Sequence, residues 1–140
     1  MTTSIFLCLF LGGAPATVDL TGSYEHSYGD RAGALHINFV DENRAEGWMV
    51  QETREDKNSV TRWYSKVFFQ VDSQGGITMI ASYVYGEKEA TNGSEEHWDM
   101  EGERDERGRI LANGNLKILP DTWKKTGHKP VPAPKGKKLG

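Results

Sequence analysis

Two groups of side chains in this 140-residue sequence could bind a metal. The first is His97-x-Asp99-x-Glu101, whose members alternate along one extended segment. Side chains on one face of a twisted strand diverge, so this group is interpreted as a solvated acidic face. The second is His26 and His36, which lie on neighbouring predicted strands and could meet. A zinc site needs further ligands at suitable spacing, and none is visible, so we expect no metal and no cofactor.

Catalytic arrangements are not evident in the sequence. It has no Ser-His-Asp order, no phosphate-binding glycine loop and no pair of carboxylates in an apolar stretch. The carboxylates fall in runs such as Glu101 to Glu106, which are typical of solvated surface. We therefore expect that the protein is not an enzyme. The alternative is an enzyme on a barrel scaffold that uses His26 or His36 as a general base.

The aromatic residues are a stronger indication of function. Given the strand faces described below, the following rings are predicted to point into one interior: Tyr24, Trp48, Trp63, Tyr83, Tyr85 and Trp98. Ordinary core packing and a lined cavity both explain such a cluster. His26 shares a face with Tyr24 and Tyr28, and a buried imidazole needs partners that a bound polar group could supply. We interpret the cluster as a cavity for a small, partly aromatic molecule.

Short alternating segments separated by turns position these side chains. No window has a helical apolar period of ten or more residues, and the pattern predicts a meander of about eight antiparallel strands. The predicted strands are 20–28, 34–40, 45–53, 60–71, 77–85 and 94–103, followed by a hairpin over 110–118 that turns at Asn113-Gly114. Leu35, Ile37 and Phe39 are expected on one face, and 86–93 is expected to be a charged loop.

The fourth predicted strand has the clearest period of two. Trp63, Val67 and Phe69 fall on one face, whereas Tyr64 and Lys66 fall on the other. Eight sequential strands of this kind can close into an up-and-down barrel that is either filled by side chains or holds one small ligand. The predicted fold class is therefore all-β, a single antiparallel meander barrel over residues 17–128.

Charge is unevenly distributed along the chain. The stretch from Asp19 to Asp121 has 20 acidic residues and 11 Lys and Arg, which gives −9, whereas 124–140 has six lysines and no acid. An acidic body repels phosphate backbones, so we expect no nucleic-acid partner. Residues 129–140, with three prolines among lysines, are expected to form an extended, disordered tail.

The first residues resemble an export signal. An apolar run from Ile5 to Leu11 precedes Ala14-Pro15-Ala16, whose small residues suit a cleavage site. A strand of the barrel is the alternative, and a membrane span is excluded because it needs about 20 apolar residues. We expect residues 1–16 to be a signal peptide and the mature protein to be extracellular or periplasmic. Cleavage would remove Cys8 together with the signal peptide. Asn92-Gly93-Ser94 is a possible glycosylation sequon.

Several short motifs resemble the avidin and streptavidin family. They are Leu20–Tyr24, Glu46–Trp48, His97-Trp98 and Asp121–Thr126, in the order in which that family carries Leu-Thr-Gly-Thr-Trp, Thr-Gly-Thr-Tyr, a sixth-strand tryptophan and Trp-Lys-x-Thr. A generic lipocalin-like (calycin) barrel accounts for them nearly as well. The resemblance implies an eight-stranded barrel with a small ligand at one end. It also implies that Trp98 and Trp123 contact the ligand and that Trp123 reaches a neighbouring subunit of a homo-oligomer.

The polar positions depart from that family. His26 replaces an expected Asn, Asp30 an expected Ser, and Val50 another Ser, so biotin is a candidate that lacks most of its polar contacts. The predicted function is a secreted small-molecule-binding barrel, and the alternative is a secreted interaction module such as an inhibitor or effector. The predicted ligand-binding residues are Tyr24, His26, Asp30, Trp48, Trp63, Tyr83, Tyr85, Trp98 and Trp123.

Overall fold

The computed structural model describes residues 19–137 and residue 139, and this part of the chain contains nine β-strands and no helix. The strands are β1 Gly22–Tyr28, β2 Arg31–Asp41, β3 Arg44–Asp56, β4 Ser59–Val71, β5 Gly76–Ala90, β6 Glu95–Trp98, β7 Glu103–Ile110, β8 Leu116–Ile118 and β9 Asp121–Gly127. The predicted signal peptide and Cys8 lie outside the described residues. No helix among the described residues is long and apolar enough to cross a membrane.

Eight of the strands close into one antiparallel barrel. Strands β1 to β5 pair in sequence, β5 then pairs with β7, β7 with β8 and β8 with β9, and β9 returns to β1. Strand β6 is an extra element that pairs only with the distal part of β5. Closure removes the unpaired edges that an open sheet would expose. The predicted all-β meander barrel is confirmed, with one additional strand.

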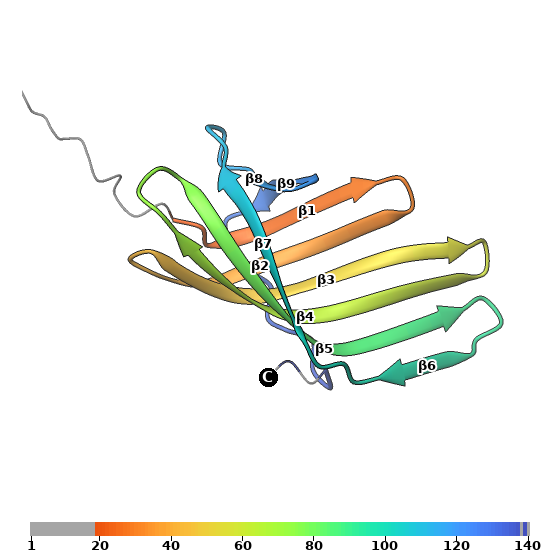
Figure 1. The fold of residues 1–140 in the computed structure, drawn as a ribbon. Helices are drawn as coiled ribbons and strands as arrows, with labels where there is room; N and C mark the ends of the chain where they lie inside the picture. The colour runs from red at the N-terminus through yellow and green to blue at the C-terminus, as the bar shows by residue number, and fades with distance from the viewer. Residues whose placement is uncertain (1–18, 138, 140) are drawn as a thin grey trace, which may run out of the picture.

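The longer hairpins extend beyond the barrel on one side. Figure 1 shows the β1–β2, β3–β4 and β5–β6 hairpins projecting to the right, while β7 crosses the sheet toward β8 and β9. The projecting part corrects one prediction, because residues 86–90 continue β5 instead of forming a loop. Charged side chains can occupy this extension because they pair across strands: Arg62 of β4 contacts Glu87 at 3.5 Å and Glu89 at 3.0 Å.

The barrel interior is filled by side chains from β1 to β5, β8 and β9, and Ile110 of β7 packs against them partly buried. The predicted faces of β4 are confirmed at Val67 and Phe69, which are buried opposite the outward Lys66. The interior cluster comprises Leu20, Tyr24, Leu35, Ile37, Ala45, Met49, Val67, Phe69, Ile77, Met79, Ala81, Leu116, Ile118 and Trp123. Tyr24 donates its hydroxyl to the carbonyl of Leu20 at 2.9 Å. Burial raises the pKa of Tyr24 to about 12, so the hydroxyl remains a neutral donor.

Two β-bulges change the face that the sequence predicts for the residues beyond them. The register shifts between Ile37 and Phe39 in β2, and Phe39 is 51% exposed instead of sharing the face of Ile37. A second shift lets Ser65 pair with Tyr83 while Tyr64 pairs with Tyr85. One extra residue on a strand reverses the alternation of side chains. The predictions that Phe39 and Tyr85 share the inward faces of their strands are therefore wrong.

Candidate functional site

The polar residues inside the barrel gather at the end where the β1–β2 turn and the β8–β9 turn lie. Strand β1 alternates between faces, and His26 follows Tyr24 on the inner face, as predicted. Its cross-strand partner is Gly33. A side chain on Gly33 would place its Cβ 2.7 Å from His26 Nε2 and 2.9 Å from Trp123 Cη2. Glycine is therefore required at this position for the two rings to occupy the interior.

His26 is buried and has no hydrogen-bond partner among the residues that the structure describes. The ring packs against Trp123 at an interplanar angle of 58° with centroids 4.2 Å apart, and Nδ1 lies 3.8 Å from Asp121 Oδ1. Both ring nitrogens are buried and unpaired among the described residues. Burial lowers the pKa of His26, and the nearby Asp121 carboxylate opposes this effect only in part. A neutral imidazole with an unpaired donor and an unpaired acceptor can bind a polar group of a ligand.

Asp121 connects His26 to the mouth of the barrel. Arg31 Nη2 lies 3.3 Å from Asp121 Oδ1, and a pocket of about 120 Å³ opens beside this pair. The pocket is lined by Arg31, Gln51, Met79, Arg104, Glu106, Ile118, Leu119, Pro120, Asp121 and Trp123. We call this group, together with His26, the mouth site. Each of its arginines faces a carboxylate, because Arg104 Nε lies 2.9 Å from Glu106 Oε1.

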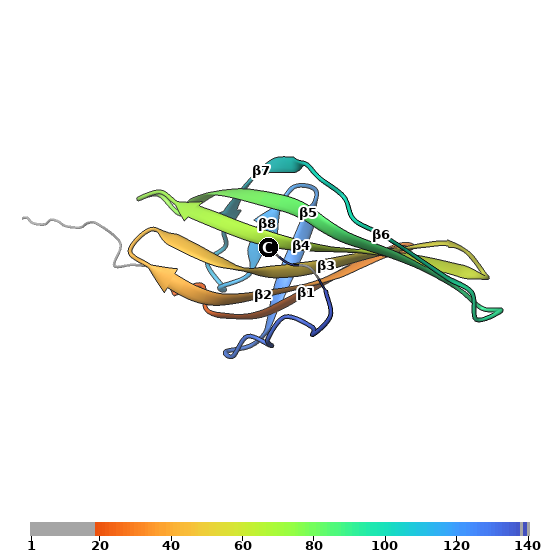
Figure 2. The ribbon, with the colours of Figure 1, turned by 90° about the horizontal axis from the view of Figure 1, so that it is seen from below.

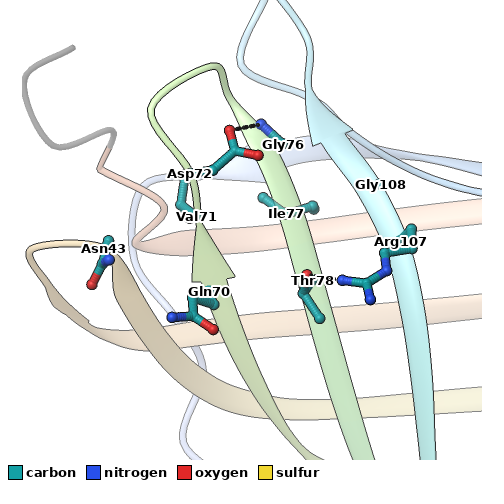
Figure 3. A pocket seen from close by; sticks show the side chains of 9 residues that line it. All are labelled: Asn43, Gln70, Val71, Asp72, Gly76, Ile77, Thr78, Arg107 and Gly108. Carbon is teal, nitrogen blue, oxygen red and sulfur yellow. Dashed lines mark hydrogen bonds between the residues drawn. The ribbon is translucent and has the colours of Figure 1, made fainter. Parts of the chain in front are cut away.

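Another depression, of about 420 Å³, lies at the opposite end of β4 and β5. Figure 3 shows Asp72 turned toward Gly76, to whose N–H it is bonded at 2.8 Å, which closes the β4–β5 turn. Arg107 points to Thr78 and bonds its hydroxyl. The polar groups in this depression therefore serve the local structure.

The outer face of the barrel holds the C-terminal segment. Figure 2 shows this segment leaving β9 and passing outside the strands. Ser23 donates to the carbonyl of Lys129 at 2.7 Å, and Trp48 Nε1 donates to the carbonyl of Val131 at 2.7 Å. His36 Nδ1 accepts the N–H of Val131 at 3.3 Å. Within the segment 129–140, for which the composition predicts a disordered tail, Lys129, Val131 and Lys137 make hydrogen bonds to the barrel.

The predicted ligand-binding residues separate into several locations. Tyr24, His26, Tyr83 and Trp123 face the interior, Trp48 and Tyr85 face outward, Trp63 and Trp98 lie on the projecting hairpins, and Asp30 is in the exposed β1–β2 turn. The prediction of one inward cluster of six rings is therefore wrong. Trp123 is 2% exposed within its own barrel, so its ring does not project from the barrel surface.

Other predicted groups are also separated. His26 is inside the barrel and His36 outside, so the expectation that they could meet is wrong. The described residues contain no group of three or more His, Cys, Asp or Glu side chains arranged to hold a metal. Asn92 is exposed in the β5–β6 turn, where its side-chain oxygen accepts the N–H of Ser94 at 3.0 Å.

Sequence reasoning did not identify Arg31 and Asp121 as members of the mouth site. In the sequence, Asp121 follows a predicted turn and precedes Trp123 by two positions. This pattern indicates the start of a strand but does not indicate a binding residue. Comparison of the chain with protein-family models, curated proteins and solved structures gave no match. The barrel itself is of a kind that can hold one small ligand.

Proposed function

We propose that this chain is an exported, non-catalytic barrel protein that binds a small polar molecule at the mouth site. The observation that supports this proposal best is the buried His26 ring beside the pocket residues Asp121 and Trp123, because neither ring nitrogen has a hydrogen-bond partner within the described part of the chain. An unpaired buried polar group costs about 1–3 kcal/mol. A ligand that bonds to this ring, directly or after a small shift of Asp121, would recover part of that cost.

The size and charge of the pocket narrow the class of ligand. Pockets for drug-sized molecules measure about 300–1,000 Å³, whereas this one measures about 120 Å³. Its two arginines are each within 3.3 Å of a carboxylate, so the site has little net charge. The arrangement favours a neutral or zwitterionic molecule of a few heavy atoms, such as a small amide or amino acid. Biotin would require the pocket to enlarge.

The experiment is a calorimetric and thermal-shift titration of the full chain with urea-like amides, glycine, alanine and biotin. We expect saturable binding of at least one small amide or amino acid. His26→Leu should weaken that binding at least about tenfold, since a hydrogen bond to a buried group contributes about 1 kcal/mol or more. His128→Gln, which changes an exposed histidine, is the matched control. Absence of binding across the panel, or equal binding by His26→Leu, would reject the mouth site.

A second candidate is a secreted protein-interaction module. The segment from Glu95 to Glu106 is largely exposed and carries seven acidic residues and one arginine. Such a surface attracts cationic partners in a salt-dependent manner. Replacing Glu95, Glu96 and Glu101 by Gln should abolish capture of a basic protein at low salt if this surface is used. Capture that survives this replacement rejects the second candidate.

A further inference from the structure

A lysine near the end of the chain is held by two tyrosines and a carboxylate on the outside of the barrel. Lys137 Nζ lies 2.6 Å from Glu87 Oε2, 4.7 Å from the ring centroid of Tyr64 and 4.6 Å from that of Tyr85. The lysine side chain is 19% exposed. An ammonium group within about 6 Å of two aromatic faces and bonded to a carboxylate has the surroundings of an aromatic cage. We call Tyr64, Tyr85, Glu87 and His97 the outer cage.

Contacts that do not involve Lys137 hold the outer cage together. Tyr64 and Tyr85 are cross-strand partners on β4 and β5, with centroids 5.9 Å apart. Tyr64 donates its hydroxyl to Glu87 Oε1 at 3.0 Å, and the hydroxyl of Tyr85 lies 2.5 Å from His97 Nδ1. Each side chain of the outer cage is therefore positioned by another side chain of the cage and by the β-sheet that carries it. The cage should persist when the lysine leaves.

Charge in the outer cage favours an ammonium group. Burial acts to raise the pKa of Glu87, but hydrogen bonds from Lys137 and Tyr64 outweigh it and the pKa is lowered. Burial, followed by the charge of Glu87, raises the pKa of Tyr64 to about 12. Glu87 is thus anionic and Tyr64 neutral at pH 7. Besides Lys137, Arg62 Nη1 lies 3.5 Å from Glu87 Oε1 and His97 Nδ1 lies 3.9 Å from Glu87 Oε2.

The residues that precede Lys137 in the C-terminal segment tether it to the outside of the barrel. Lys129 and Val131 are bonded to β1, β2 and β3, and the chain then crosses to β4 and β5 through an exposed stretch that includes Pro132 and Lys135. A tethered group competes with free ligands at an effective concentration in the millimolar range. Lys137 is therefore an internal ligand that lowers the apparent affinity of the cage for others.

We propose that the outer cage is a binding site for the lysine side chain of an extended basic segment on a partner protein, and that Lys137 occupies it in cis until displaced. Complementary charge supports this choice of partner, because the body of the chain carries −9 and its own basic segment already docks there. The site is separate from the mouth site, so either proposal can fail without the other.

The test is an NMR titration of the full chain with Nα-acetyl-lysine methylamide, which needs only the cage. Lys137→Ala should show saturable shifts at Tyr64, Tyr85 and His97. Wild type should bind at least about tenfold more weakly because the tethered lysine competes. Lys135→Ala, which changes an exposed lysine of the same segment, should behave as wild type. The Nε-trimethyl probe should bind and the Nε-acetyl probe should not.

Two further variants keep the test decisive. Glu87→Gln added to Lys137→Ala should abolish binding of the lysine probe. If the amide spectrum shows that Lys137→Ala does not fold, Lys137→Met, which keeps an apolar stem over the two rings, replaces it. Equal affinity in wild type and the Lys137 variant, or equal response to the acetylated probe, overturns the proposal.

Discussion

The Nδ1 atom of His36 accepts the backbone N–H of Val131 at 3.3 Å, although 95 positions separate the two residues. An acceptor nitrogen must be unprotonated. Ser23 Oγ lies 2.8 Å from the same nitrogen and 2.7 Å from the carbonyl of Lys129, and which of the two receives its single proton depends on the tautomer of the His36 ring. The position of the C-terminal segment therefore depends on the protonation state of one imidazole.

Acid should release the C-terminal segment. Burial lowers the pKa of His36 below its ordinary value of 6.5, and Glu25 opposes this effect in part. His36 therefore binds a proton less readily when the C-terminal segment is docked than when its imidazole is free. Docking is fully stabilised above pH 6.5, and this stabilisation is lost as the pH falls through the lowered pKa of His36. Amide exchange of Val131, measured between pH 7.5 and 5, should accelerate beyond its intrinsic pH dependence. An unchanged protection factor over this range would contradict the prediction.

Removing the indole donor should loosen the same segment at neutral pH. Trp48→Phe deletes the N–H that Val131 accepts at 2.7 Å and keeps most of the ring that packs 4.7 Å from His36. A net contribution of about 0.5–1.5 kcal/mol predicts exchange of the 129–137 amides about two- to tenfold faster. The barrel amides of β3 serve as the internal reference. Trp98→Phe, on the β6 hairpin, is the control and should leave this exchange unchanged.

The strand pattern of the sequence was sufficient to predict the barrel. A period of two from Trp63 to Phe69 placed the inward face of β4 correctly, and Asn113-Gly114 marked the β7–β8 turn. Local patterns do not reveal bulges, however. The shift between Tyr64 and Ser65 leaves Tyr83 inside and Tyr85 outside, and this one change separates rings that the alternation had grouped together.

The candidate sites depend on contacts between residues far apart in the sequence. Composition indicates that 129–137 is extended, but it does not indicate that Ser23, His36 and Trp48 offer it hydrogen bonds. In the same way, His26 was found from its place beside Tyr24, whereas Asp121 reaches it only through the closure of β1 on β9. Such pairs follow from register, which the sequence alone does not give.

Ser65 is a place where substitution should stabilise the protein. Its hydroxyl is buried inside the barrel with no hydrogen-bond partner among the described residues, and the residue is 1% exposed. Ser65→Ala should raise the free energy of unfolding by about 1 kcal/mol, because the cost of an unpaired group is removed. Ser23→Ala is the contrasting variant and should lower it by about the same amount, since that hydroxyl is bonded. Urea unfolding of both variants tests the pair, and a loss of stability in Ser65→Ala would be the contrary result.

Gly33→Ala should destabilise the barrel through the mouth site. The added Cβ would lie 2.7 Å from His26 Nε2 and 2.9 Å from Trp123 Cη2, and both rings are buried. Overpacking of this kind costs about 1–3 kcal/mol, which should appear as a lower urea midpoint with an unchanged slope. Gly127→Ala is the matched control, because its Cβ would meet nothing within 4 Å. The fluorescence of Trp123 should also change in Gly33→Ala and should not change in Gly127→Ala. Equal fluorescence spectra and equal urea midpoints in the two variants would contradict this packing of the His26 and Trp123 rings.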